Sequence, residues 1–396
     1  MEINVNKDHS TLRRLKRLKK GWVMLKAGGI LAVILTVAVI IMWLCTGAEL
    51  AVKILLTVAA LLTVIILLFL GTVNASVASR QVKLIDRVLL LTLWWLPPLN
   101  IILLRRLYKT AKREYIVESD RIELENARAS NEICKTKYPV ILVHGIFFRD
   151  WQIMNYWGRI PASLIRNGTV VYYGGQQSSR SVADSAQELR QTILRVLAET
   201  GADKVNIIAH SKGGLDSRYA ISKLGMYEHV ATLTTINTPH KGCDMVDFLL
   251  EKLPDSFAQF IAGIYNSIFS KLGDTAPDFM AGVRDLSAVR ARSYDAEMPD
   301  SPLVSYRSFM SVMTSPRSAG FPLNIGFRLI NRLNGANDGL VWEESARHGS
   351  YTLINSPKKR GISHGDVIDL LRENIEGFDV REFYIDIVRS LKSEGY

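Results

Sequence analysis

One serine in this chain of 396 residues stands where an enzyme would place a nucleophile. In the segment Val205–Gly214 a mostly apolar run leads to Ser211, and small residues stand two positions before and after it. This pattern is typical of a nucleophile elbow, in which a strand turns sharply into a helix and presents one hydroxyl. Such a turn leaves little room two residues before and after the serine; Gly213 meets this demand and Ala209 meets it approximately. The alternative is an ordinary buried strand followed by a helix.

A serine hydroxyl needs a base and an acid before it can attack a carbonyl carbon. In enzymes of the α/β-hydrolase class the acid and the histidine follow the serine in that order. Asp338 lies in a tight turn, residues 337–341, where backbone amides can hold its carboxylate. His364 follows the last predicted strand and leaves the sheet at the edge where the base is required. We therefore predict Ser211, Asp338 and His364 as nucleophile, acid and base.

A tetrahedral intermediate also needs two preorganised N–H donors, and losing one typically costs about 10²–10³ in rate. The amide of Lys212 lies at the positive end of the predicted elbow helix and is one candidate. The amide of Ile146, directly after His144 and Gly145, is the other. The side chain of Lys212 is expected to be exposed, with no catalytic role.

The remaining histidines receive other roles. His348 precedes the last predicted strand, so we expect it at the opposite end of the sheet, on the surface. His240 comes too early in the chain for the base and is expected to stabilise a loop. His210 is expected to point away from the face of the elbow that carries the nucleophile.

These side chains require a sheet that brings their strand ends together. Apolar runs predict strands, and helical spacing predicts helices between them; the strands are residues 139–143, 169–173, 204–209, 232–237 and 351–355, and the helices 181–200 and 367–374. Alternating strands and helices predict a mostly parallel sheet covered on both faces. Functional residues gather at the carboxyl ends of such strands, which is where Ser211 lies.

Residues 243–300 interrupt this alternation with helical segments rich in apolar residues. These are Phe248, Leu249, Phe257, Phe260, Ile261, Ile264, Tyr265 and Phe269. They could form a lid over an acyl-binding cleft or a further core layer. We predict the lid, which indicates an apolar substrate.

Charge is concentrated at the N-terminal end. Residues 1–120 hold 17 Lys and Arg against 7 Asp and Glu, whereas the other 276 residues hold 32 against 31. A nucleic-acid-binding enzyme would spread its basic patch over the folded domain, so we exclude that partner. Three cysteines give no disulfide framework; one Cys134–Cys243 bridge stays open, and buried free thiols are favoured.

The basic tail, residues 1–26, precedes a predicted membrane region, residues 27–104. Two uncharged runs, residues 27–44 and 54–70, can each cross a hydrocarbon core of about 30 Å at about 1.5 Å per residue. A cleaved signal peptide fits poorly, because the second run follows at once and no small-residue cleavage site separates them. We predict a retained helical hairpin in a multi-pass membrane protein.

A third apolar run, residues 88–104, is interrupted by Pro97 and Pro98, which break a helix into two short halves. It could dip into the bilayer and return, lie in the interface with Trp94 and Trp95 at headgroup depth, or cross with a kink. Basic residues favour the cytoplasmic side, and they mark residues 7–26, 80–87 and 105–113. All three stretches can be cytoplasmic only if the third run does not cross. We favour a cytoplasm-facing domain, residues 138–396, joined by a charged linker, residues 105–137.

Four segments of the chain are similar to bacterial triacylglycerol lipases of the pseudomonad type. They are residues 138–145, YPVILVHG, residues 204–215, KVNIIAHSKGGL, residues 236–242, INTPHKG, and residues 337–341, NDGLV. The resemblance covers about 138–375. It implies an α/β-hydrolase fold, with Ser211, Asp338 and His364 as the triad and Ile146 and Lys212 as oxyanion-hole positions.

The chain departs from this family at three points. Ala209 replaces the usual glycine. The family holds a structural calcium near the catalytic histidine, but only Asp366 matches a ligand position, so we expect no cofactor and assign no metal. The relatives are secreted, whereas this chain carries apolar N-terminal segments.

We conclude from the sequence that this is a membrane-anchored serine hydrolase acting on lipid or other acyl esters, with the bilayer as its partner and an unknown oligomeric state. One alternative is an acyltransferase that uses the same triad with an alcohol or lipid acceptor. Another is a catalytically silent membrane scaffold.

Overall fold

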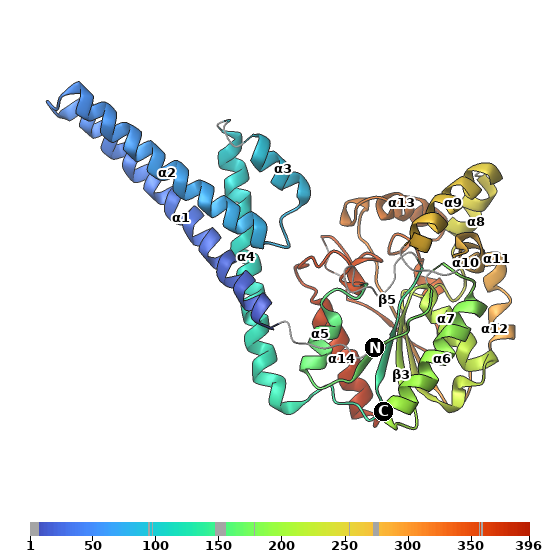
Figure 1. The fold of residues 1–396 in the computed structure, drawn as a ribbon. Coiled ribbons are helices and arrows are strands. Elements are labelled where there is room, and N and C mark those ends of the chain that lie inside the picture. The colour runs from blue at the N-terminus through green and yellow to red at the C-terminus, as the bar shows by residue number, and fades with distance from the viewer. Residues whose placement is uncertain are drawn as a thin grey trace. The chain divides into compact units, whose positions relative to one another are not determined.

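A computed structural model describes residues 8–93, 96, 98–146, 156–177, 179–252, 254–271, 277–355, 357 and 359–396. The chain divides into two compact units, Val5–Ala127 and a C-terminal unit that begins at Arg128 (Figure 1). The C-terminal unit starts before Tyr138 because Arg128 pairs with Glu382 at 2.8 Å and the amide of Cys134 donates to the carbonyl of Asn167.

The C-terminal unit is built on one sheet of six strands in the order β2-β1-β3-β4-β5-β6. The strands are β1 (Val140–Val143), β2 (Val171–Tyr173), β3 (Val205–His210), β4 (Val230–Ile236), β5 (Ser305–Met310) and β6 (Ser350–Leu353). All five neighbouring pairs are parallel. The predicted parallel α/β architecture is confirmed.

Side chains that alternate along β1 fill two cores, one on each face of the sheet. Val140 and Leu142 pack with α5 (Ile160–Arg166) and α14 (Val380–Ser393). Ile141 and Val143 pack with α6 (Val182–Thr200) and α7 (Lys212–Lys223) on the other face (Figure 1). Both faces are therefore covered, which is why β1 and β3 read as continuous apolar runs.

The predicted insertion is helical. Between β4 and β5 the chain forms α8 (Asp244–Lys252), α9 (Asp255–Lys271), α10 (Phe279–Asp285), α11 (Ala288–Ala291) and α12 (Tyr294–Glu297). Of the apolar side chains predicted to line it, Phe248 and Ile264 are exposed and Tyr265 is half-buried. The side chains of Leu249, Phe257, Phe260, Ile261 and Phe269 lie outside the described residues.

Three elements differ from the sequence predictions. The helix expected over residues 367–374 is wrong: only a 3-10 turn, Asp366–Ile368, forms, because Asp369 and Arg372 adopt left-handed backbone conformations with φ of 58° and 55°. Strand β5 was not predicted because its sequence, SYRSFM, has no apolar run. The sequence patterns also did not predict the helices α5, α13 (Leu323–Leu333) and α14.

The N-terminal unit consists of α1 (Asp8–Cys45), α2 (Leu50–Ala78), α3 (Leu84–Thr92) and α4 (Leu99–Arg128). A core that includes Leu18, Ala75, Leu90 and Leu107 joins all four helices. The third apolar run is broken into two helices, as predicted, with α3 ending at Thr92 and α4 beginning at Leu99. Only α3 is short, because α4 continues through most of the charged segment expected to be a linker.

Two helices in the described part of the chain, α1 and α2, are long and apolar enough to cross a membrane. Only 6% of the most apolar window of each is buried inside the protein. A core helix of a soluble protein would be mostly buried, so these helices indicate membrane association. The three cysteines are free thiols: Cys134 and Cys243 are buried and Cys45 is exposed.

Candidate active site

Ser211 occupies a sharp turn between β3 and α7. Its backbone has φ 54° and ψ −132°, a region that L-residues adopt only under constraint from their surroundings. The constraint comes from neighbours on both sides: the amide of Ser211 donates to the carbonyl of Ile236, and the Thr238 hydroxyl donates to the Ser211 carbonyl at 2.8 Å. The sequence prediction of an elbow corresponds to this geometry.

Close packing explains the small residues around the turn. A Cβ added at Gly213 would lie 2.4 Å from the carbonyl oxygen of His144, and one at Gly145 would lie 2.7 Å from the Cβ of Ser211. Ala209, in contrast, is fully buried in the core with α6 and α7, so its methyl group has room in that core. The departure from glycine at position 209 is thus accommodated by the fold.

His364 and Asp338 are in direct contact. The Nδ1 atom of His364 lies 2.6 Å from Oδ2 of Asp338, and the His364 amide donates to the Asp338 carbonyl. The other carboxylate oxygen, Oδ1, accepts the amides of Leu340 and Val341, each at 2.8 Å. Asp338 is fully buried, and these donors keep its negative charge aimed at the imidazole.

Asn237 completes the set of donors and was missed by sequence reasoning. Its Nδ2 donates to Oδ2 of Asp338 at 2.6 Å and to the hydroxyl of Ser311 at 2.7 Å. Asn237 directly follows β4 and has φ 49°, a conformation that asparagine tolerates better than most residues. The signal was present: an asparagine at the carboxyl end of a predicted strand next to the elbow strand.

The predicted oxyanion-hole positions both lie beside the elbow. Strands β1 and β3 pair with Val143 opposite Ala209, so the loop that carries Gly145 and Ile146 leaves the sheet next to Ser211. Lys212 is the first residue of α7, whose N-terminal amides carry partial positive charge. Residues 147–155 lie outside the described residues.

His210 is placed differently from the prediction. Its ring does not point away from the site but lies against His364, with ring centroids 4.4 Å apart. Its Nδ1 lies 2.6 Å from the hydroxyl of Tyr156, which itself accepts the amide of Gly145 at 3.0 Å. Burial lowers the pKa of His210 well below its usual value, and repulsion from His364 lowers it further. The ring that packs against the predicted base, His364, is therefore the neutral imidazole of His210.

The Lys212 side chain is buried, not exposed as predicted. Its Nζ donates to Oδ1 of Asp216 at 2.7 Å and to the hydroxyl of Ser185 on α6 at 3.0 Å, and both charged side chains are almost fully buried. Burial raises the pKa of Asp216 to about 7, an effect that the ion pair opposes. The pair fastens the first turn of α7 to α6, directly behind the amide predicted to bind the oxyanion.

Removing one partner of this pair is expected to cost more stability than removing both. Asp216→Leu leaves a buried ammonium unpaired and should lower the free energy of unfolding by about 3–5 kcal/mol, whereas Lys212→Met/Asp216→Leu should be nearly neutral. Denaturant unfolding of the full chain in detergent measures both. Equal losses in the single and double variants would contradict the ion-pair explanation.

The buried His240 stacks on the ring of His348, with ring centroids 4.5 Å apart. His240 lies 3.0 Å from the hydroxyl of Thr235, which agrees with a loop-stabilising role. His348 pairs with Asp300 at 3.1 Å, and its side chain is only 12% exposed, so the expected surface position is wrong. Burial lowers the pKa of His240 well below its usual value, with repulsion from His348 and then Arg218 adding to the effect.

Two buried neutral histidines predict acid sensitivity. His210 and His240 protonate near pH 6.5 in the unfolded chain, whereas burial lowers their pKa values well below that in the folded protein. The stability they contribute is complete above about pH 6.5 and decreases as the pH falls, by up to about 1.4 kcal/mol per pH unit for each histidine. Thermal unfolding between pH 8 and pH 5 should show a shallower decrease for His240→Gln than for the control His229→Gln. An identical pH dependence in the two variants would refute this account.

Asp366 does not fit a calcium site. Its Oδ2 accepts the amide and hydroxyl of Ser363, at 2.9 and 2.7 Å, and its Oδ1 accepts the guanidinium of Arg360 at 3.1 Å. A cationic side chain therefore already neutralises the carboxylate. Within the described residues no group of three or more His, Cys, Asp or Glu side chains could hold a metal ion.

Comparison with known proteins gives a family match inside the C-terminal unit. The model of lipase (class 2) matches residues 137–239. The chain is 34% identical over 189 residues to the triacylglycerol lipase of Burkholderia plantarii, covering 45% of this chain and 52% of that protein. It is 25% identical over 292 residues to the triacylglycerol lipase of Pseudomonas fragi, covering 66% of this chain and 98% of that protein.

Among solved structures, a metagenomic carboxyl esterase shares the fold, with a TM-score of 0.52 at 14% identity, covering 65% of this chain and 76% of that one. The chain spans about half the length of curated relatives such as the Burkholderia protein. The resemblance to bacterial triacylglycerol lipases and the α/β-hydrolase fold are confirmed by these matches.

Proposed function

We propose that the chain hydrolyses carboxylic esters through an acyl-enzyme formed on Ser211. The observation that carries this proposal is the contact between His364 and Asp338, 2.6 Å long, in the same unit as a serine held in a strained elbow. The similarity to triacylglycerol lipases supports the same reaction type. Such a constellation generates a serine nucleophile at neutral pH.

In the proposed reaction the Oγ of Ser211 attacks the acyl carbon while its proton passes to Nε2 of His364. Asp338 holds the imidazole by its Nδ1–H and stabilises the imidazolium. The amides of Ile146 and Lys212 donate to the oxyanion. Collapse expels the alcohol, which takes the proton from His364, and a water molecule then releases the acid by the same steps.

The proposed substrate is a lipid or another ester with an apolar acyl chain. The helical insertion that follows β4 exposes Phe248 and Ile264, with exposed fractions of 37% and 47%. Apolar side chains left in water on such an insertion are suited to cover an acyl chain or to meet a lipid surface. We therefore propose that the insertion acts as the lid.

We further propose that α1 and α2 anchor the chain in a bilayer as a hairpin. The second half of α1 and the first half of α2 expose apolar side chains, such as Ile34 and Leu55, along most of their length. The polar groups gather at the far end, where Nζ of Lys53 donates to the carbonyl of Thr46 at 2.9 Å and Nε1 of Trp43 donates to the hydroxyl of Thr57 at 3.0 Å. Such a distribution fits a span with its tip at the opposite interface.

Turnover of p-nitrophenyl esters with acyl chains of 4, 8, 12 and 16 carbons tests the reaction, with the full chain in detergent micelles. We expect hydrolysis, and covalent labelling of Ser211 by a fluorophosphonate. Absence of both turnover and labelling would overturn the proposal. Turnover that requires an added acceptor alcohol would replace it with the acyltransferase.

A further inference from the structure

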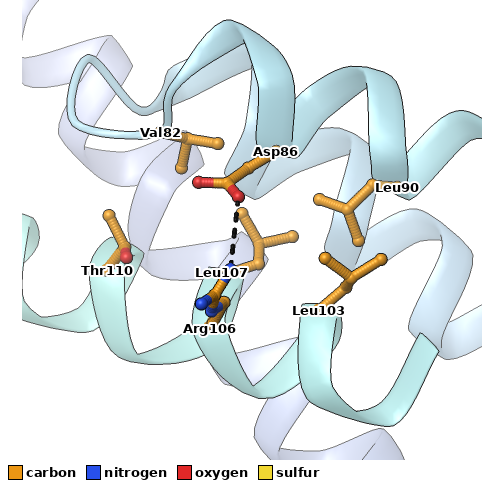
Figure 2. Close-up of a pocket in the computed structure, with 7 residues that line it drawn as sticks. All are labelled: Val82, Asp86, Leu90, Leu103, Arg106, Leu107 and Thr110. Atoms are coloured by element: carbon orange, nitrogen blue, oxygen red, sulfur yellow. Dashed lines mark ion pairs between the residues drawn. The ribbon is translucent and has the colours of Figure 1, made fainter. Parts of the chain in front are cut away.

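The proline-interrupted segment forms a tight helical hairpin rather than a kinked span. Helices α3 and α4 run antiparallel, because Asp86 pairs with Arg106 at 3.8 Å while Leu90 and Leu103 line the same cavity (Figure 2). That cavity has a volume of about 10 Å³, the space of about one water molecule. The two helices are therefore in close contact, and the chain reverses between Leu93 and Leu99.

The length of α3 decides whether this hairpin can cross a bilayer. Its nine residues rise by about 13 Å at 1.5 Å per residue. A hydrocarbon core is about 30 Å thick, so this length reaches through about one leaflet. The hairpin must return to the side from which it entered.

The outer face of the hairpin is apolar and has no protein partner in the described residues. Leu84 and Leu91 are 77% and 81% exposed, and Ile85, Ile101 and Ile102 are also exposed. The inner face is occupied, since Leu90 and Leu103 are buried in the core of the N-terminal unit. An exposed apolar surface of this kind marks an interaction site.

The backbone at the reversal suits a site without water. Pro97 and Pro98 carry no N–H group, and the amide of Leu96 donates to the carbonyl of Leu93 at 3.1 Å. Beyond the prolines, the amide of Ile101 donates to the carbonyl of Pro98 at 3.1 Å. Among the described residues of this stretch, the amides of Leu96 and Ile101 thus have acceptors, as hydrocarbon requires. Trp94 and Trp95, expected at headgroup depth, lie outside the described residues.

The base of the hairpin is strongly basic. Residues 80–113 contain eight Lys and Arg against one acidic residue, Asp86. Lys83 precedes α3, and Arg105 and Lys109 lie on the part of α4 opposite its start, where all three are exposed. A cationic rim under an apolar face complements the anionic headgroups of a lipid leaflet.

Glu114 on α4 connects the basic base of the hairpin to α1 and α2. Its carboxylate is buried and accepts the hydroxyl of Ser79 at 2.5 Å, the amide of Arg80 at 3.0 Å and the guanidinium of Arg14 at 2.5 Å. The end of α2, the loop that leads from it to α3, and the basic part of α1 thus meet at one place on α4. The apolar spans of α1 and α2 and the hairpin therefore begin near the same residue, Glu114.

We propose that α3 and the first turns of α4 form a re-entrant hairpin in one leaflet, with the basic base bound to anionic headgroups. This proposal rests on the anchoring by α1 and α2 proposed above. It places the N-terminal tail and the C-terminal unit on the same side of the membrane. Because basic residues favour the cytoplasmic side, that side is the cytoplasm.

The proposal is tested in the full chain by measuring how deeply two attached fluorophores lie in a lipid bilayer. A fluorophore sensitive to quenching is attached at Leu91→Cys or, for the anchor, at Ile40→Cys, in a Cys45→Ser background; the other two cysteines are buried. In vesicles of phosphatidylcholine and phosphatidylglycerol, doxyl-labelled acyl chains should quench both. Quenching at position 40 without quenching at position 91 overturns the hairpin and leaves the anchor; no quenching at either overturns the anchor.

Two further measurements test side and headgroup. A membrane-impermeant maleimide should label Lys83→Cys and Lys109→Cys from the same side, in inside-out vesicles but not in intact cells; labelling from opposite sides overturns the re-entrant path. Omitting phosphatidylglycerol should lower quenching at position 91 at least twofold while leaving position 40 unchanged. Equal quenching at position 91 in both lipid mixtures overturns the headgroup contact.

Discussion

Replacing Ser211 with alanine is expected to lower kcat for ester hydrolysis by about 10⁴–10⁶-fold and to abolish labelling by a fluorophosphonate. The reason is that Ser211, at the elbow between β3 and α7, is the proposed nucleophile, and alanine has no hydroxyl to attack the acyl carbon. The change removes one atom from a side chain whose backbone conformation alanine can share with serine. Kinetics with a p-nitrophenyl ester, alongside thermal unfolding, separate lost chemistry from lost folding.

Ser222→Ala is the matched control, because Ser222 lies on the same helix, α7, and is half-buried. Its turnover and labelling should equal those of the unmodified chain. If Ser211→Ala kept more than a few per cent of turnover while Ser222→Ala lost it, the elbow assignment would be wrong. A Ser211→Ala protein that fails to unfold cooperatively would instead point to a structural role for this hydroxyl.

Asp338→Asn is expected to lower kcat by about 10⁴-fold while preserving side-chain volume. Every group around the carboxylate is a donor: Nδ1 of His364, Nδ2 of Asn237 and two backbone amides. An asparagine amide directs its own donors at two of these groups in either orientation, so at least one buried donor loses its acceptor. We also expect a loss of about 1–3 kcal/mol in the free energy of unfolding.

A second variant separates the two effects. In Asp338→Asn/Asn237→Asp the new carboxylate can accept from the new amide, which should restore most of the stability. Turnover should stay low, because the amide would still face Nδ1 of His364 and hold the wrong tautomer. Recovery of both stability and turnover would show that Asp338 acts only by keeping the fold intact.

Local sequence patterns were enough to predict most of the sheet and the positions of Ser211 and Asp338 in turns at its edge. Ser211 follows an apolar run, and Asp338 lies in a turn whose own amides at Leu340 and Val341 hold its carboxylate. Such contacts are encoded within a few residues. Strand β5 was not predicted because it contains a buried polar residue, Ser308. Its hydroxyl donates to the carbonyl of His348, which is distant in the sequence, at 2.7 Å.

The same distinction explains the errors at the site. Whether Lys212 is exposed depends on Ser185 and Asp216, one of which lies on another helix. The direction of His210 depends on Tyr156, more than fifty residues earlier in the chain. Long-range packing decided both cases. For residues 88–104 the sequence left three arrangements open; the pairing of Asp86 with Arg106 and the cavity shared by Leu90 and Leu103 show only that α3 and α4 run antiparallel.

The strand order has a consequence for the order of events during synthesis. The edge strand β6 and the loop with His364 are the last parts of the site to leave the ribosome. About 290 residues separate Ala78, the end of the proposed anchor, from His364, and at about 5–20 residues per second their translation takes about 15–60 s. The anchor is thus available for membrane insertion while Ser211 still lacks its base. If the chain is the anchored ester hydrolase proposed above, a nascent chain would reach its lipid surface before it could cleave any ester.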